Sequence, residues 1–148
     1  MSKKSIGKAA AAGFAMGTLL AIGALAPVNA APVSFPVDVV VHTVFGVEVS
    51  EFEGNIPGCE TGTVVEGDGG PHFTPWGGVY LGVKEFTCAG GEGGIDVRLN
   101  ARFSDAGATG TWRVIEGWGF LEGVKASGTL VGVPTDVGID DRYTGSAR

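Results

Sequence analysis

The C-terminal third of the chain, from Gly94 onward, has the pattern of short β-strands separated by glycine-containing turns. In the first strand apolar and polar side chains alternate without a break. The apolar set is Ile95, Val97, Leu99, Ala101 and Phe103, and the polar set is Asp96, Arg98, Asn100 and Arg102. This period of two is typical of a strand with one face in a core and the other in water. Further strands are expected at residues 110–116, 124–131 and 138–147, and the block favours a small antiparallel β-barrel or sandwich.

The N-terminal half supplies weaker strand signals. We expect strands at residues 37–43, 45–52, 62–66 and 77–87. Residues 67–71, of sequence GDGGP, predict a turn, because glycine adopts positive φ and proline cannot donate a ladder hydrogen bond. Residues 89–94 predict a hairpin connection. The sequence therefore predicts an all-β fold, a single small antiparallel β-barrel of about eight strands after a cleaved signal peptide.

The first thirty residues have the pattern of a secretory signal peptide. Lys3, Lys4 and Lys8 precede an uncharged run at residues 9–26, and Val28-Asn29-Ala30 is a small-residue cleavage site. A retained membrane anchor is the alternative, but the run contains three glycines and is weakly hydrophobic. We expect residues 1–30 to be removed, residues 31–148 to form one secreted domain, and no membrane span to remain.

The mature chain is strongly acidic. Removing residues 1–30 takes away three of the ten Lys and Arg residues and none of the sixteen acids, which leaves a net charge of −9. A surface of this charge repels phosphate backbones, so nucleic-acid binding is not expected.

The chain has two cysteines, Cys59 and Cys88. An even number in an exported chain favours a structural disulfide, which would tie the connection at residues 54–62 to the end of the strand at 77–87. A metal-binding or reactive thiol pair is the alternative, but the spacing matches no metal motif.

Four short motifs resemble the barrel family of plant allene oxide cyclases and dirigent proteins, and more closely the small secreted actinobacterial proteins with allene-oxide-cyclase-like domains. They are GTWRV at residues 110–114, GWGFLEG at 117–123, SGTL at 127–130 and YTG at 143–145, with Trp118 where the family pattern usually has Thr. The resemblance covers residues 94–147. It implies an eight-stranded barrel whose cavity binds or cyclises a hydrophobic small molecule in some relatives. Because relatives form dimers or trimers, it also implies a homo-oligomer.

No spacing in the chain selects a catalytic group, so the catalytic residues remain unknown. His42 and His72 lie far apart in sequence, and His72 belongs to a stiff aromatic loop at residues 70–76 that is able to cap a barrel mouth. Acidic residues recur in two groups, Glu66 with Asp68, and Asp136 with Asp140 and Asp141. Neither group follows the calcium-loop pattern, and we expect no metal and no cofactor.

Three functions remain open: binding of a small apolar ligand in the barrel, a cyclase or isomerase acting in the same cavity, and a non-catalytic extracellular protein that interacts through its outer surface. A buried acid–base pair in the cavity would favour the enzyme, whereas a filled interior would leave the surface role. The face bearing Arg98 and Arg102 either lines the barrel or meets water, and the second arrangement is the commoner one. The candidate ligand-lining residues are Trp76, Trp112, Trp118 and Tyr143.

Overall fold

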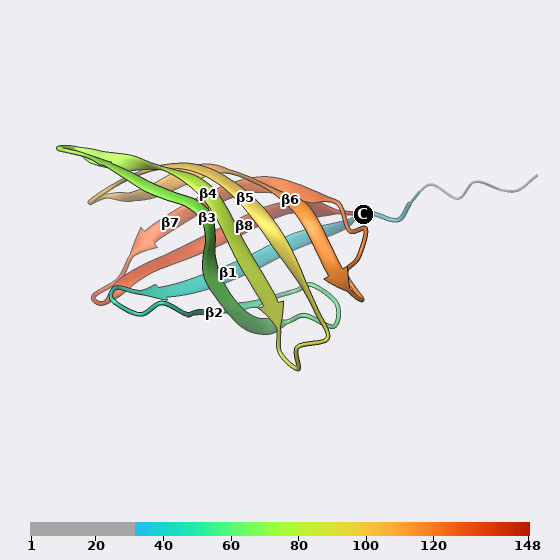
Figure 1. The fold of residues 1–148 in the computed structure, drawn as a ribbon. Helices are drawn as coiled ribbons and strands as arrows, with labels where there is room; N and C mark the ends of the chain where they lie inside the picture. Colours follow the sequence, from blue (N-terminus) through green and yellow to red (C-terminus); the bar gives the residue numbers. More distant parts are fainter. Residues whose placement is uncertain (1–31) are drawn as a thin grey trace, which may run out of the picture. The chain divides into compact units, whose positions relative to one another are not determined.

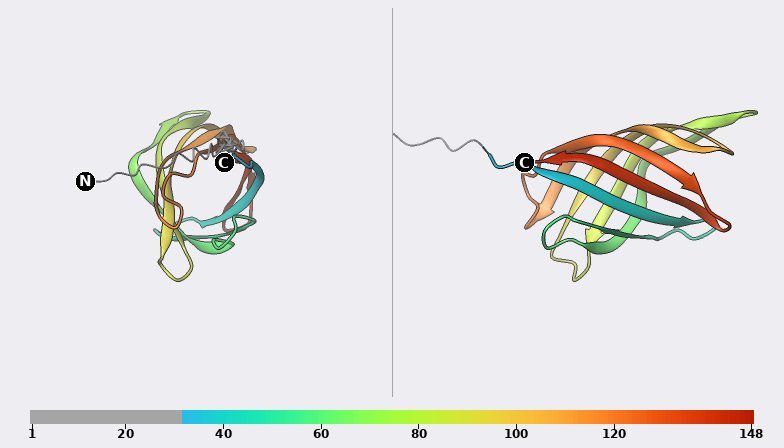
Figure 2. Two further views of the ribbon diagram at one scale, coloured as in Figure 1. Left: turned by 90° about the vertical axis from the view of Figure 1, so that its right-hand side faces the viewer. Right: turned by 180° about the vertical axis from the view of Figure 1, so that it is seen from behind.

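The computed structural model describes residues 32–148, and the expected signal peptide lies outside these residues. The described part forms eight strands in a closed barrel, in which each strand pairs antiparallel with its neighbours in the chain and β8 pairs with β1 (Figures 1 and 2). The strands are β1 (Phe35–Val44), β2 (Ser50–Gly54), β3 (Thr61–Thr74), β4 (Gly77–Cys88), β5 (Gly93–Ser104), β6 (Gly107–Gly119), β7 (Ala126–Pro134) and β8 (Gly138–Ala147). The predicted all-β, eight-stranded antiparallel barrel is confirmed. Between residues 32 and 148 no helix is long and apolar enough to cross a membrane.

The alternation in β5 determines which face of that strand is buried. Ile95, Val97, Leu99 and Ala101 are buried in the core, whereas Arg98 and Arg102 are exposed. The arginine-bearing face therefore meets water, as the commoner arrangement predicts. Leu99 lies opposite Gly82 of β4 on one side and Trp112 of β6 on the other, so these three positions face the interior together.

The predicted turn at residues 67–71 is wrong. These residues lie within β3, which runs on to Thr74, and the pairing with β4 shifts register between Glu66 and Gly69. Gly69 has a φ of +88°, and a Cβ there would lie 2.3 Å from the Leu81 carbonyl oxygen. The glycines thus form a β-bulge, which bends a strand without reversing it. The predicted aromatic loop at residues 70–76 is accordingly the end of β3 and its short turn into β4.

The expected strand at residues 45–52 is also corrected. Residues 45–49 form the connection after β1, and β2 begins only at Ser50. Phe45, Val47 and Val49 are exposed there and do not form a core face. Their alternation with polar residues imitates a strand, although no neighbouring strand pairs with them.

Aromatic rings fill the middle of the barrel. Phe86 contacts Phe52 on one side and Tyr143 on the other, with ring centroids 5.4 and 5.7 Å apart, and Tyr143 contacts Trp112 at 6.0 Å. The Trp112 indole N–H donates to the Thr129 carbonyl oxygen at 2.9 Å, so its polar atom is satisfied within the core. We name Phe52, Phe86, Tyr143 and Trp112 the aromatic layer. This layer separates the interior near one end of the barrel from the interior near the other end.

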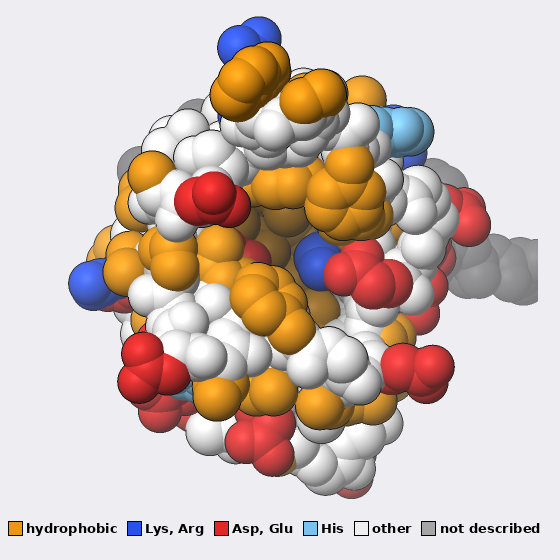
Figure 3. Space-filling model, turned by 90° about the vertical axis from the view of Figure 1, so that its left-hand side faces the viewer, with side chains coloured by type: hydrophobic (Ala, Val, Ile, Leu, Met, Phe, Trp, Pro, Cys, Tyr) orange, Lys and Arg blue, Asp and Glu red, His pale blue; other side chains and the backbone are white. Residues whose placement is uncertain are grey.

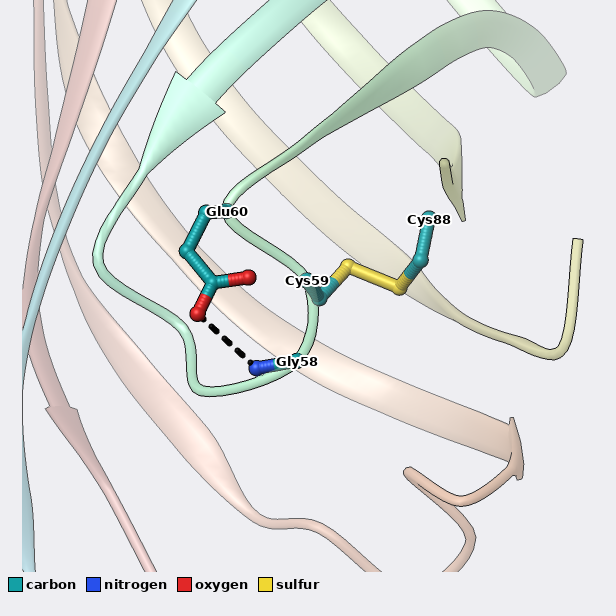
Figure 4. Close-up of a disulfide and its surroundings, with 4 residues drawn as sticks. All are labelled: Gly58, Cys59, Glu60 and Cys88. Atoms are coloured by element: carbon teal, nitrogen blue, oxygen red, sulfur yellow. Dashed lines mark hydrogen bonds between the residues drawn. A yellow bond between two sulfur atoms is a disulfide. The ribbon is translucent and has the colours of Figure 1, made fainter. Parts of the chain in front are cut away.

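Cys59 and Cys88 form a disulfide (Figure 4), and both residues are buried. It joins the connection between β2 and β3 to the last residue of β4. Next to it the Gly58 backbone N–H donates to the Glu60 carboxylate at 3.1 Å, which holds the turn in place. The bridge lies at the barrel end that also holds the β4–β5 connection, away from the β3–β4 hairpin.

Candidate functional site

The barrel is open at the end where β1 joins β2, β3 joins β4, β5 joins β6 and β7 joins β8. A cavity of about 730 Å³ enters the barrel here, and we call it the mouth cavity. Figure 3 looks into this end and shows a hollow bordered by hydrophobic side chains, with basic and acidic side chains inside it. The β3–β4 hairpin projects beyond the other strands at this end (Figure 1).

Apolar side chains cover much of the rim and upper walls of the mouth cavity. Phe45, Phe73, Phe103, Pro71 and Ile139 all line it. Phe73 packs edge-on against Phe103 with ring centroids 5.5 Å apart, yet 78% of its surface is exposed. Exposed aromatic side chains around a concavity are typical of a site that receives an apolar partner.

Below the rim, three polar side chains from adjacent strands join through one carboxylate. The Tyr80 hydroxyl and the Lys84 ammonium group each donate to a different oxygen of Glu66. The ammonium group also lies 4.8 Å from the centroid of the Tyr80 ring. Gly82 stands between Tyr80 and Lys84 on the same face, and a Cβ there would lie 3.1 Å from the Tyr80 hydroxyl. Only 13% of the Lys84 side chain is exposed. The ion pair with Glu66 therefore stabilises the positive charge of Lys84 inside the barrel.

A fourth polar side chain, Asp141, enters the cavity from β8. Its Oδ1 atom is shielded from solvent and has no hydrogen-bond partner among residues 32–148. Burial raises the pKa of Asp141 from 3.8 to about 6, with smaller contributions from the positive Lys84, which lowers it, and from Asp140 and Glu66, which raise it. Asp141 is thus a carboxyl group that ionises close to neutral pH inside the barrel.

The neighbouring strand has a glycine where Asp141 needs room. Gly132 of β7 is paired with Asp141, and a Cβ at Gly132 would lie 2.4 Å from the Oδ1 atom. Any other residue at position 132 would push the carboxyl group or the strand aside. The lack of a side chain at Gly132 therefore leaves the space that the Asp141 carboxyl group occupies.

The phenols near this cluster are held neutral. Burial, followed by the hydrogen bond to Glu66, raises the pKa of Tyr80 far above its ordinary value. Burial and then the Asp141 charge raise the pKa of Tyr143 in the same direction. Both hydroxyls therefore remain hydrogen-bond donors over the physiological pH range.

The charges around the mouth cavity are unbalanced. Three acidic residues of the described chain line it, Glu66, Asp105 and Asp141, against one basic residue, Lys84. Because Lys84 is already paired with Glu66, the carboxyl group of Asp141 is left without a counter-ion. Within residues 32–148 no group of three or more His, Cys, Asp or Glu side chains is placed to hold a metal ion.

Of the four predicted ligand-lining residues, the structure brings together only Trp112 and Tyr143, within the part of the chain that it describes. Trp112 and Tyr143 belong to the aromatic layer below the mouth cavity, where they border an apolar crevice of only about 30 Å³, close to the room that one water needs. Trp76 lies at the β3–β4 turn with 90% of its surface exposed. Trp118 packs over Gly94 near the opposite end of the barrel. None of the four lines the mouth cavity, within the part of the chain that the structure describes.

Two other sets of polar residues lie apart from the mouth cavity. A second depression of about 790 Å³ lies at the opposite end of the barrel, but its charged residues Glu116, Lys125 and Arg148 are all exposed. His42 lies on the outer face, with its Nδ1 atom 2.9 Å from the Asp140 carboxylate, and His72 is an exposed residue of β3. Neither set combines a cavity with partly buried charged groups such as Lys84 and Asp141, as the mouth cavity does.

Reasoning from the sequence missed Tyr80 and Lys84 and placed Glu66 and Asp141 in separate acidic groups. A signal was present in the alternation. Lys84 occurs on the same strand face as Tyr80 and Phe86, and Asp141 on the same face as Ile139 and Tyr143. A charged residue at an inward position of an alternating strand breaks the expected pattern and indicates a functional site.

Comparison of the chain with protein-family models, with characterised proteins and with solved structures finds no match.

Proposed function

We propose that the barrel binds a small, largely apolar molecule in its mouth cavity. The observation that carries the proposal is a cavity with aromatic and aliphatic walls above a few convergent polar groups. Its volume of about 730 Å³ lies within the range of roughly 300–1,000 Å³ that is usual for small-molecule sites. An apolar body would pack against Phe73, Phe103 and Ile139, and a polar end would reach Tyr80, Lys84 or Asp141.

Export and family membership are part of the proposal. The leader pattern at residues 1–30 and the Cys59–Cys88 disulfide support a secreted protein, because disulfides persist in oxidising compartments. The closed order of eight antiparallel strands and the motifs at residues 110–145 support an allene-oxide-cyclase-like barrel. Fold analogy alone does not carry an activity from one barrel to another.

A cyclase or isomerase acting in the same cavity is the second candidate, and Asp141 favours it. A carboxyl group with a pKa of about 6 exists in both protonation states near neutral pH, as a general acid–base group must. As a carboxylate, Asp141 would accept a proton from a substrate carbon that lies between a carbonyl group and a C=C double bond. The Lys84 ammonium would donate a hydrogen bond to the resulting dienolate oxygen, and protonated Asp141 would return the proton to the far carbon of the former double bond, which moves that bond into conjugation with the carbonyl group.

The test of binding uses N-phenyl-1-naphthylamine, an uncharged fluorescent probe that brightens in apolar surroundings. We expect saturable binding at one site per barrel and markedly weaker binding in Ala108→Trp, because Ala108 lines the mouth cavity and an indole there would take up part of the space open to the probe. Thr109→Trp is the matched control, since the neighbouring Thr109 is exposed and does not line the cavity. Equal probe binding by Ala108→Trp and the wild type would contradict the mouth cavity as the site.

Native mass spectrometry of the secreted protein supplies an independent measurement. A stoichiometric apolar passenger that is absent from Ala108→Trp supports binding in the mouth cavity. Turnover of that passenger by the wild-type protein would favour the isomerase over the binding protein.

A further inference from the structure

We infer that the ligand of the mouth cavity carries a positively charged amino group, which Asp141 binds. This inference rests on the proposed function and adds the chemical class of the ligand. An amphipathic amine, with an apolar body and one ammonium group, matches both the walls of the cavity and the charge within it.

The Asp141 carboxylate lacks a partner inside the barrel that residues 32–148 form. Its Oδ1 atom has no hydrogen-bond partner among the described residues, although nearly all buried polar atoms in folded proteins have one. The shielded Oδ1 faces Gly132, whereas Oδ2 is not shielded in this way and also has no partner among the described residues. Because Asp141 lines the cavity, a donor there can reach the carboxylate through Oδ2 and offset its charge.

The net charge of the residues that line the mouth cavity also favours a cationic ligand. The Glu66 carboxylate already neutralises Lys84 through a direct ion pair, and Tyr80 donates to the same carboxylate. Three acidic residues and one basic residue line the cavity, so one added cation reduces its net charge from −2 to −1. A carboxylate ligand would instead make the net charge of the cavity more negative, and it would have to compete with Glu66 for Lys84.

The groups that face Asp141 from the neighbouring strands do not compensate its negative charge. Glu66 on β3 is negative, Tyr80 on β4 is neutral, and Lys84 on β4 is the paired cation. The β1 and β7 residues paired with Asp141 are Val41 and Gly132, which carry no charge. On β8 itself, Asp140 adds a second negative charge from the outer face, where it contacts His42. The uncompensated charge at this point in the barrel is therefore negative.

The experiment compares three probes of the same chain length: octylamine, 1-octanol and octanoate. Each displaces bound N-phenyl-1-naphthylamine from the wild-type protein, from Asp141→Asn and from Asp140→Asn. At pH 7.5 we expect octylamine to displace the probe at least about tenfold better than 1-octanol, because a hydrogen bond to a charged partner is stronger than a neutral one. Asp141→Asn should reduce this preference to about twofold or less, and Asp140→Asn should keep it.

A change of pH provides a second readout. Between pH 7.5 and pH 5 octylamine stays protonated while Asp141 gains a proton, so the preference for octylamine should fall in the wild type and stay constant in Asp141→Asn. Equal displacement by octylamine and 1-octanol would overturn the inference while leaving apolar binding intact. Stronger displacement by octanoate would assign the site to anions through Lys84. Failure of the fluorescent probe to bind at all would instead refute the proposed function.

Discussion

The replacement of Asp141 by asparagine should stabilise this protein at neutral pH. In the wild type the ionised carboxylate lies among apolar walls, its Oδ1 atom lacks a hydrogen-bond partner within the described chain, and its one nearby cation, Lys84, is paired with Glu66. Asparagine has almost the same shape and carries no charge. The substitution therefore removes the cost of burying the anion and keeps the packing against Gly132.

The magnitude follows from the pKa. Asp141 has a pKa of about 6 in the folded protein, against 3.8 as its ordinary value. Each pH unit of difference corresponds to about 1.4 kcal/mol, so the ionised group costs the folded state about 3 kcal/mol at any pH above about 6. Because the folded-state pKa is raised, the folded protein holds its proton more tightly than the unfolded chain does. The destabilisation is therefore absent below about pH 3.8, grows between pH 4 and 6, and is complete above pH 6.

The assay is urea unfolding of the wild type and Asp141→Asn at several pH values between 4 and 8. We expect nearly equal free energies of unfolding at pH 4 and an advantage of about 3 kcal/mol for the variant at pH 7.5. Subtracting the two curves of unfolding free energy against pH cancels the contributions of the other titrating groups. Asp38 is one of these groups, and its pKa is lowered by its hydrogen bond to Arg142. Asp140→Asn is the control, because Asp140 contacts His42 on the outer face. A difference between wild type and Asp141→Asn that does not change with pH would refute the reasoning.

Two further predictions concern the barrel itself. Replacement of Cys59 and Cys88 by serine releases a loop with a sequence separation of 29 residues. It should lower stability by about 3 to 4 kcal/mol and lower the thermal midpoint, and an unchanged midpoint would contradict a structural role. Trp112→Phe removes the indole donor to the carbonyl oxygens of Thr129 and Thr144 and should cost about 1 to 3 kcal/mol in urea unfolding followed by circular dichroism. A loss well below 1 kcal/mol would show that these contacts contribute little.

The fold was most predictable where side chains alternate strictly. The expected strand at residues 138–147 coincides with β8, and the alternation from Ile95 to Phe103 correctly identified the buried face of β5. The turn expected at residues 67–71 failed for a physical reason. Positive φ at Gly69 serves a bulge as well as a turn, and only pairing with β4, which local sequence does not encode, distinguishes them.

The candidate site was much less predictable than the fold. Glu66, Lys84 and Asp141 are far apart in the sequence and meet only because the barrel closes β8 against β1 and aligns β3 with β4. The tryptophans did not point to the mouth cavity, since Trp76 is exposed at a turn and Trp112 is packed in the core. A tryptophan contributes apolar surface in any of these positions, so its presence alone does not locate a cavity.

The arrangement around Asp141 supports our proposal of a function inside the barrel. An unpaired carboxylate at this position costs stability, and an apolar residue there would be more stable. This barrel has the opposite arrangement: Gly132 leaves space for the Asp141 carboxyl group, and the mouth cavity lies open beside it. Natural proteins commonly retain destabilising groups at sites of binding or catalysis, where stability and function conflict. If Asp141→Asn is more stable above pH 6 and also loses the preference for octylamine, one carboxylate accounts for both effects. A more stable variant with an unchanged preference for octylamine would contradict the role of Asp141 in ligand binding while leaving apolar binding in the mouth cavity intact.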